Sequence, residues 1–151
     1  LGIQKQDTDS DMAVEVKAVC LKSLNEPARA LEHFELLFQR KPSVDLAYEM
    51  ADLKIQIDDI VGANASIAYG ISNSLDETMK PYYETQKPYQ VPIKAGFLYL
   101  KAIAKYRENP ETNYDAATTI LDEALSIAPE FNLATLAKNA IVNQKEASIK
   151  Q

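Results

Sequence analysis

Apolar residues recur at helical spacing along most of this 151-residue chain, and prolines and polar turns interrupt the pattern. The first such segment carries four of them at intervals of three or four residues, Ala13, Val16, Cys20 and Leu24. This spacing places apolar side chains on a helix face. A polar turn, Asn25-Glu26-Pro27, follows it. No segment shows a convincing alternation of the kind that predicts a strand. The chain is therefore predicted to be all-helical.

The predicted helices come in pairs that are joined by short polar turns. Each helix is about 12–16 residues long, and a helix of this length is not stable by itself in water. Stacked hairpins bury the apolar faces of neighbouring helices against each other, as in a solenoid. An irregular stretch, residues 74–91, contains several tyrosines and prolines and interrupts the series after the fourth helix.

A more specific pattern lies within the second helix of each pair. A small residue is followed by a large one four positions later and by a proline eight positions after that. The two complete examples are Ala30, Phe34 and Pro42, and Ala117, Leu121 and Pro129. Ala65 and Tyr69 repeat the first step in the fourth helix. The small residue lets two helices approach closely, the large one fills the groove between hairpins, and proline ends the helix.

This pattern resembles the tetratricopeptide repeat, a helix–turn–helix unit of ~34 residues with an A-x3-F…P signature in its second helix. Ala18, twelve residues before Ala30, stands at the close-packing site of the family's first helix. The Trp and the Leu-Gly of the first-helix signature are missing, and Ala30 and Ala65 are 35 residues apart.

The resemblance implies an all-α, right-handed α–α superhelix of about three hairpins and a terminal helix. After a flexible lead-in at residues 1–10, a single domain is expected over residues 11–147. Its parts are expected at residues 11–44, 45–73 and 94–130, with a closing helix at 131–147 and an insertion at 74–93.

In the family, the first helices line the concave face that binds a partner. Transferred to this chain, the resemblance implies partner-binding residues Glu15, Val19 and Lys22, then Glu49, Leu53 and Gln56, then Leu98, Ala102 and Lys105. The alternative for Val19, Leu53 and Leu98 is a place in the core. Some members hold an acidic tail with basic clamp residues, and the corresponding positions here carry no basic side chain. A basic or apolar partner segment is therefore expected.

The tyrosines of the insertion form a second candidate surface, made of Tyr82, Tyr83 and Tyr89. Tyrosine is enriched at binding hot spots, and a long ordered loop is often functional. The alternative is that these rings pack back on the helices and fill a gap between the second and third hairpins.

Charge argues against nucleic acid and against an anionic membrane surface as partners. The 16 Lys and Arg are scattered among 22 Asp and Glu, with a net charge of -6, whereas phosphate backbones bind clustered positive charge. No stretch approaches the ~20 apolar residues of a membrane span. The partner is expected to be a protein or peptide, and a homodimer formed through an uncapped end is also considered. The compartment stays open between cytoplasm and periplasm, the latter for a mature form after signal removal.

Few residues are suited to catalysis or metal binding. His33 is the single histidine, and Cys20 is the single cysteine. We interpret Cys20 as a small buried residue. The segment Asp7-Thr8-Asp9-Ser10-Asp11 opens like a calcium loop, but Met12 and Ala18 stand where the loop needs Gly and Glu. No glycine cluster could hold a phosphate. We expect no catalytic residue, no metal and no cofactor.

The sequence therefore predicts a non-catalytic scaffold that holds a peptide or protein segment in a concave groove. Two alternatives stay open. One is an accessory domain of a larger enzyme or uptake assembly. The other is a small-molecule binder that uses the Tyr-rich insertion, which a closed apolar cavity near Tyr89 and Tyr99 would favour.

Overall fold

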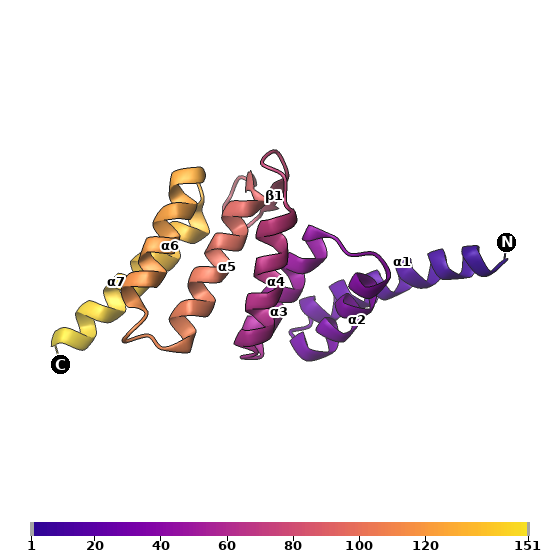
Figure 1. Ribbon diagram of the computed structural model, residues 1–151, viewed down its shortest axis with the longest axis horizontal. Coiled ribbons are helices and arrows are strands. Elements are labelled where there is room, and N and C mark those ends of the chain that lie inside the picture. The colour runs from indigo at the N-terminus through magenta and orange to yellow at the C-terminus, as the bar shows by residue number, and fades with distance from the viewer. Residues whose placement is uncertain (1, 151) are drawn as a thin grey trace. The chain divides into compact units, whose positions relative to one another are not determined.

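The computed structural model describes residues 2–150 of the chain and the side chains of residues 11–149. Within this range the chain forms seven helices and a two-stranded antiparallel sheet (Figure 1). Two compact units can be distinguished, Leu1–Tyr69 and Gly70–Gln151, and the boundary falls inside a helix. The prediction of a mostly helical chain whose sequence neighbours pack together is confirmed.

The first unit consists of three helices and most of a fourth: α1 (Gly2–Ser23), α2 (Pro27–Arg40), α3 (Val44–Gln56) and α4 (Ile60–Asn73). Helix α1 packs on α2, and α2 packs on α3. Pro27 lies in the first turn of α2, where its missing N–H is not needed. The core that these helices share contains Ala18, Leu21, Ala30, Leu31, Phe34, Leu37, Met50 and Leu53.

The turns that end α1 and α3 have the same geometry. Asn25 and Asp58 follow these helices with φ angles of 59° and 66°, in the left-handed region that Asn and Asp tolerate better than most residues. In each turn the next N–H donates to the carbonyl five positions back, as in a Schellman motif. The pairs are Glu26 to Leu21 at 2.9 Å and Asp59 to Lys54 at 2.8 Å. The equivalent residues Asn25 and Asp58 are 33 positions apart.

The same period of 33 residues relates the small side chains at the helix contacts of this unit. Ala18 in α1 and Ala51 in α3 are both fully buried, and so are Ala30 in α2 and Ala63 in α4. The large residues four positions later, Phe34 and Ile67, are also buried. Two consecutive hairpins of this unit are therefore structural repeats of each other.

This period corrects the register that the sequence pattern predicts for α4. The pattern matches Ala30 to Ala65, 35 residues on, but Ala65 is exposed and Ala63 occupies the buried position. The helix rotates by about 100° per residue, so a shift of two positions turns a side chain from the core to the solvent.

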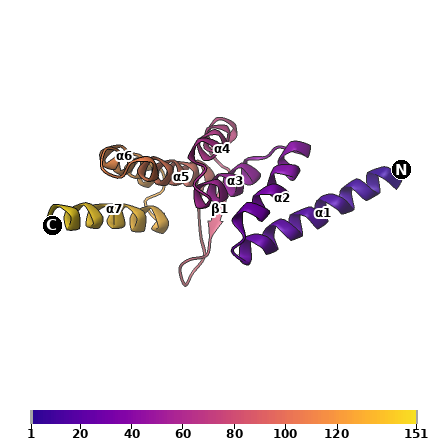
Figure 2. The same cartoon turned by 90° about the horizontal axis from the view of Figure 1, so that it is seen from below.

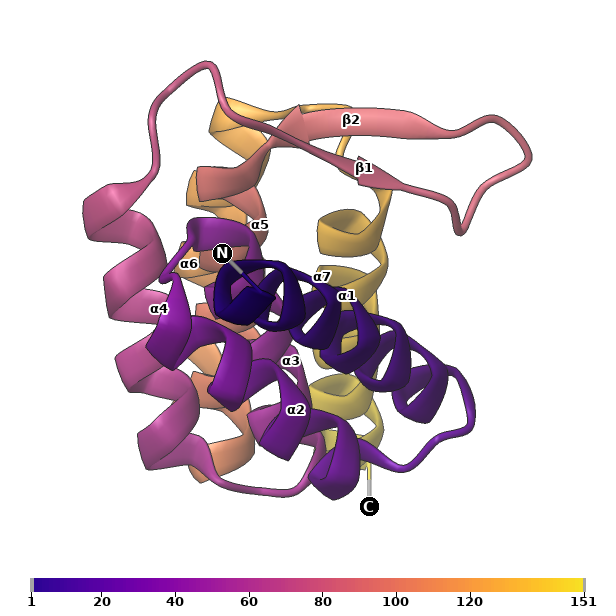
Figure 3. The same cartoon turned by 90° about the vertical axis from the view of Figure 1, so that its right-hand side faces the viewer.

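The second unit begins in the last turn of α4 and continues with two strands and three helices. These are β1 (Met79–Tyr82), β2 (Tyr89–Pro92), α5 (Ile93–Glu108), α6 (Tyr114–Ile127) and α7 (Asn132–Lys150). The strands pair antiparallel, with Met79 opposite Pro92 and Tyr82 opposite Tyr89. Helix α5 packs on α6, and α6 on α7. The hairpin lies over the N-terminal ends of α5 and α7 (Figure 3).

Two boundaries differ from the sequence predictions. Helix α1 starts at Gly2, whereas a flexible lead-in is expected over residues 1–10; no proline interrupts this segment. The insertion at 74–93, expected to be irregular, contains the β-hairpin. Its strands are only four residues long and each includes a proline, so the sequence gives no strand alternation to detect.

Candidate partner-binding surfaces

The predicted first-helix face of the first unit is formed by α1 and α3. Glu15, Val19 and Gln56 are exposed there, as a partner-binding surface requires. Leu53 is fully buried and belongs to the core, which is the alternative considered from the sequence. The face therefore offers one apolar and several polar side chains.

Lys22 of α1 connects this face to α3 through two carboxylates. Its ammonium contacts Glu49 directly and lies 3.4 Å from Asp52. Burial by itself lowers the pKa of Lys22, but the attraction of Glu49 and Asp52 and their hydrogen bonds outweigh it and raise the pKa above 10.5. Lys22 and Glu49 are both predicted to bind a partner, but in this structure they form an ion pair with each other. Glu49 and Asp52 share the single ammonium group of Lys22.

The side of α1 that faces away from α2 is apolar and exposed. Met12, Val16 and Val19 expose 63%, 61% and 52% of their area. Leu24, in the turn that follows α1, exposes 70%. Cys20 is exposed too, so its interpretation as a small buried residue is wrong. The sequence pattern misleads here because α1 is apolar on two opposite faces, and periodicity alone does not say which face is buried. In Figure 2, α2 lies along one side of α1, and no other helix of this unit covers the opposite side.

In the second unit, the predicted first-helix residues belong mostly to the core. Ala102 is fully buried and Leu98 exposes only 9%, whereas Lys105 is exposed. The reason is that α5 packs against α6, α7 and both strands, so most of its circumference is covered. Leu98 and Ala102 are therefore not available to a partner on this surface.

The tyrosines of the insertion divide into two groups. Tyr82 is buried and stacks on Tyr89 with 5.5 Å between the ring centroids. Both rings contact Phe131, which is fully buried at the start of α7 and also meets Tyr99 of α5. Tyr83 exposes 71% of its area at the end of the hairpin. The rings of Tyr82 and Tyr89 thus pack back on the helices, and Tyr83 alone offers an open aromatic surface.

Polar contacts fix Tyr89 to the start of α7. Its hydroxyl donates to Glu84, which also accepts from Asn132 at 3.3 Å. The N–H of Leu133 lies 3.4 Å from the Tyr89 oxygen. Burial, and then the hydrogen bond to Glu84, raise the pKa of Tyr89 above its usual value of 10.0. These contacts identify the hairpin as a structural cover for the ends of α5 and α7.

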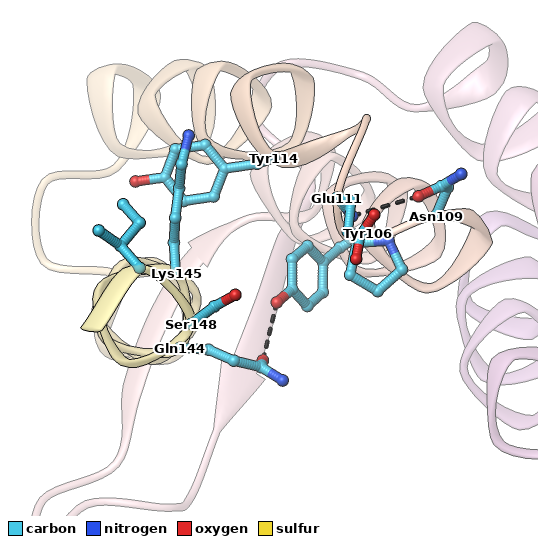
Figure 4. A pocket seen from close by; sticks show the side chains of 9 residues that line it. Tyr106, Asn109, Glu111, Tyr114, Gln144, Lys145 and Ser148 are labelled. Atoms are coloured by element: carbon cyan, nitrogen blue, oxygen red, sulfur yellow. Dashed lines mark hydrogen bonds between the residues drawn. The ribbon is translucent and has the colours of Figure 1, made fainter. Parts of the chain in front are cut away.

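A cavity of about 490 Å³, which the sequence reading missed, lies near the opposite end of α5 (Figure 4). Its walls come from the end of α5, the loop before α6, the start of α6 and the end of α7. The Tyr106 hydroxyl donates to Gln144 at 2.7 Å, and the Lys145 ammonium lies 3.9 Å from the centre of the Tyr114 ring. Two tyrosines that flank a polar loop are the only signal of this cavity in the sequence.

The loop beside the cavity is held by asparagines. Asn113 stands at the N-cap of α6, but its side chain donates to the Lys105 carbonyl at 2.9 Å and does not cap the helix. The Asn109 side chain accepts the N–H groups of Glu111 and Thr112, each at 3.2 Å. Both backbone donors are therefore already satisfied within the loop.

In the part of the chain whose side chains are described, no three His, Cys, Asp or Glu residues gather as ligands for a metal ion. Among the described helices, none has the length and apolar character needed to cross a membrane. Comparison with models of known protein families gives no match, and comparison with curated protein sequences gives none either.

Proposed function

We propose that this chain is a non-catalytic protein-binding scaffold of the tetratricopeptide type, with hairpins stacked as a right-handed superhelix. The repeat of 33 residues between its first two hairpins supports this proposal, because it lies close to the ~34-residue period of that family. The matching turns and buried alanines stand at equivalent positions of the two hairpins. Such repeats bury their apolar faces against neighbours and leave one helix face for binding.

The binding site in this proposal is the face formed by α1 and α3 in the first unit. One observation carries it: the exposed apolar side chain of Val19 lies one helical turn from Lys22, whose ammonium contacts two carboxylates of α3. Glu15 adds an exposed carboxylate on the same side of α1. A partner segment with basic and apolar side chains complements this surface, since opposite charge steers association and apolar contacts supply affinity.

A charge reversal tests the site. Glu15→Lys introduces repulsion toward a basic partner, while Glu49→Lys is a poorer choice because it would place a lysine against Lys22 and weaken the fold. Glu32→Lys on α2 is the matched control, since Glu32 is an exposed acid of the same unit on a second helix.

The measurement is affinity capture from a cell extract with the three proteins side by side. We expect a protein that the wild type and Glu32→Lys retain and that Glu15→Lys loses. Equal capture by all three would contradict the α1–α3 face, and capture of no protein by any of them would contradict the scaffold function.

The two alternatives from the sequence receive less support. A small-molecule site under the Tyr-rich insertion is disfavoured because the rings of Tyr82, Tyr89 and Tyr99 already pack against Phe131. A role as accessory domain of a larger assembly is compatible with the same α1–α3 face, with the assembly as the partner.

A further inference from the structure

Helix α1 carries an uncharged stripe on the side that faces away from the core. Its central residues are Met12, Val16, Val19 and Ser23, all exposed and spaced by four, three and four positions. This is the spacing of the d and a positions in a coiled-coil heptad. Ala13 and Cys20, both exposed, occupy the e positions, and Glu15 and Lys22 occupy the g positions. The opposite face, with Ala18 and Leu21, is buried in the unit.

The stripe is complementary to itself when two copies run antiparallel. With a two-fold axis between positions 17 and 18, Val16 faces Val19 of the second copy, and Met12 faces Ser23. The g positions then pair with each other, so that Glu15 of each copy meets Lys22 of the other. The e positions pair in the same way and bring only small side chains together, Ala13 and Cys20. All of these pairings follow from one axis.

The charges at the edge of the stripe favour this arrangement. An ammonium group has three N–H donors, and Lys22 directs its group toward Glu49 and Asp52 on α3. Its side chain is 33% exposed, which leaves it accessible to a further carboxylate from outside the unit. Two Glu15–Lys22 pairs would form per dimer, whereas a parallel arrangement would set Glu15 at g beside the e position of the second copy, Cys20, and form no such ion pair.

We propose that two copies of this chain associate through antiparallel α1 helices, with Met12, Val16, Val19 and Ser23 at the seam and reciprocal Glu15–Lys22 ion pairs beside it. The stripe covers about three helical turns, so the area it can bury is smaller than the roughly 800 Å² per partner of a typical stable complex. The dimer is therefore weak and forms only at high protein concentration. It uses Glu15, Val19 and Lys22 of the proposed partner-binding face but forms without any other partner, so its failure would leave the proposed scaffold function standing.

Sedimentation equilibrium of the purified chain, from low to several hundred micromolar, measures this association. Val16→Glu would bury two carboxylates per dimer at the seam and is expected to weaken it roughly a hundredfold. Leu24→Glu is the control, since Leu24 is similarly exposed but lies in the turn after α1, outside the seam. Circular dichroism and thermal melting of both variants confirm that the first unit stays folded.

A second measurement reads the register. Isotope-labelled and unlabelled chains are mixed, and a zero-length carbodiimide reagent joins carboxylates to amines that are in contact. We expect cross-linked peptides that join Glu15 of one label to Lys22 of the other. A monomer at all concentrations would overturn the proposal, and so would a dimer that Val16→Glu leaves intact. Growth beyond a dimer, or mixed-label links confined to other residues, would also overturn it.

Discussion

The register of α4 provides a sharp test of the structural repeat. Ala63 and Ala65 lie two positions apart in one helix, and the same substitution can be made at each. Ala63→Leu places three additional carbon atoms where the side chain is fully buried, whereas Ala65→Leu places them in solvent. The intrinsic helix propensities cancel in this comparison, because both changes replace Ala by Leu within α4. The difference between the two variants therefore reports packing.

The expected magnitude follows from the burial of the two sites. Extra carbon atoms in a well-packed contact cost about 1–3 kcal/mol, because neighbouring side chains must leave their preferred rotamers. A substitution on an exposed surface usually stays within about 0.5 kcal/mol. We therefore expect Ala63→Leu to lower the free energy of unfolding by about 1–3 kcal/mol relative to Ala65→Leu. For a chain of this size, that corresponds to a fall in Tm of roughly 2–10 °C.

Urea denaturation followed by far-ultraviolet circular dichroism measures this difference, with the slope of the transition as a check that the unfolded states are comparable. Equal stability of the two variants would contradict the 33-residue register. A greater loss for Ala65→Leu would restore the 35-residue register that the sequence pattern favours.

Three further predictions concern other parts of the molecule. Phe131→Ala removes the ring on which the tyrosines of the hairpin pack and is expected to cost about 3–5 kcal/mol, measured by urea denaturation; a loss below about 1 kcal/mol would refute the structural role of the cluster. Gly70→Ala places a Cβ 2.1 Å from the Phe97 ring. The clash outweighs the gain in helix propensity, and the free energy of unfolding is expected to fall by about 1–2 kcal/mol. A more stable variant would contradict this contact. Lys22→Met leaves Glu49 without its lysine and is expected to cost about 0.5–2 kcal/mol near neutral pH. Folding raises the pKa of Lys22, so the stability that its ion pair contributes is fully present below about pH 10.5 and is lost as pH rises through the folded-state pKa. The difference in unfolding free energy between wild type and variant should therefore vanish in urea titrations at strongly alkaline pH. A difference that does not change with pH would contradict the ion pair.

Much of the helical architecture could be predicted from the sequence because its determinants are local. Apolar spacing predicts the helices, and the expected polar turn before Pro27 separates α1 from α2. Ala30, Phe34, Ala117 and Leu121 are all buried, as their pattern indicates. These residues lie on helices with a single apolar face, and for such helices spacing alone tells the core side from the solvent side.

The misassignments arise where residue type and spacing do not determine which face is covered. Ala65 matches the family signature by type, but the common turn geometry of Asn25 and Asp58 sets the register and buries Ala63. Cys20 lies on a helix with two apolar faces. Leu98 is buried because long-range contacts surround α5, and no local pattern encodes these.

The candidate site could be predicted only in part, for a related reason. Glu15 and Val19 are exposed as expected, since both lie toward the solvent side of α1. The pairing of Lys22 with Glu49 joins residues 27 positions apart, and only the packing of α1 beside α3 brings them together. The cavity between Tyr106 and Lys145 likewise depends on the return of α7 toward the end of α5.

Hydrogen–deuterium exchange, with and without the protein that the wild type captures, tests the central claim most directly. A partner that binds the face formed by α1 and α3 slows exchange in peptides that cover residues 11–23 and 44–56, and leaves the peptides of the second unit unchanged. Slowed exchange confined to residues 70–149, or no change anywhere in the chain, would contradict the account.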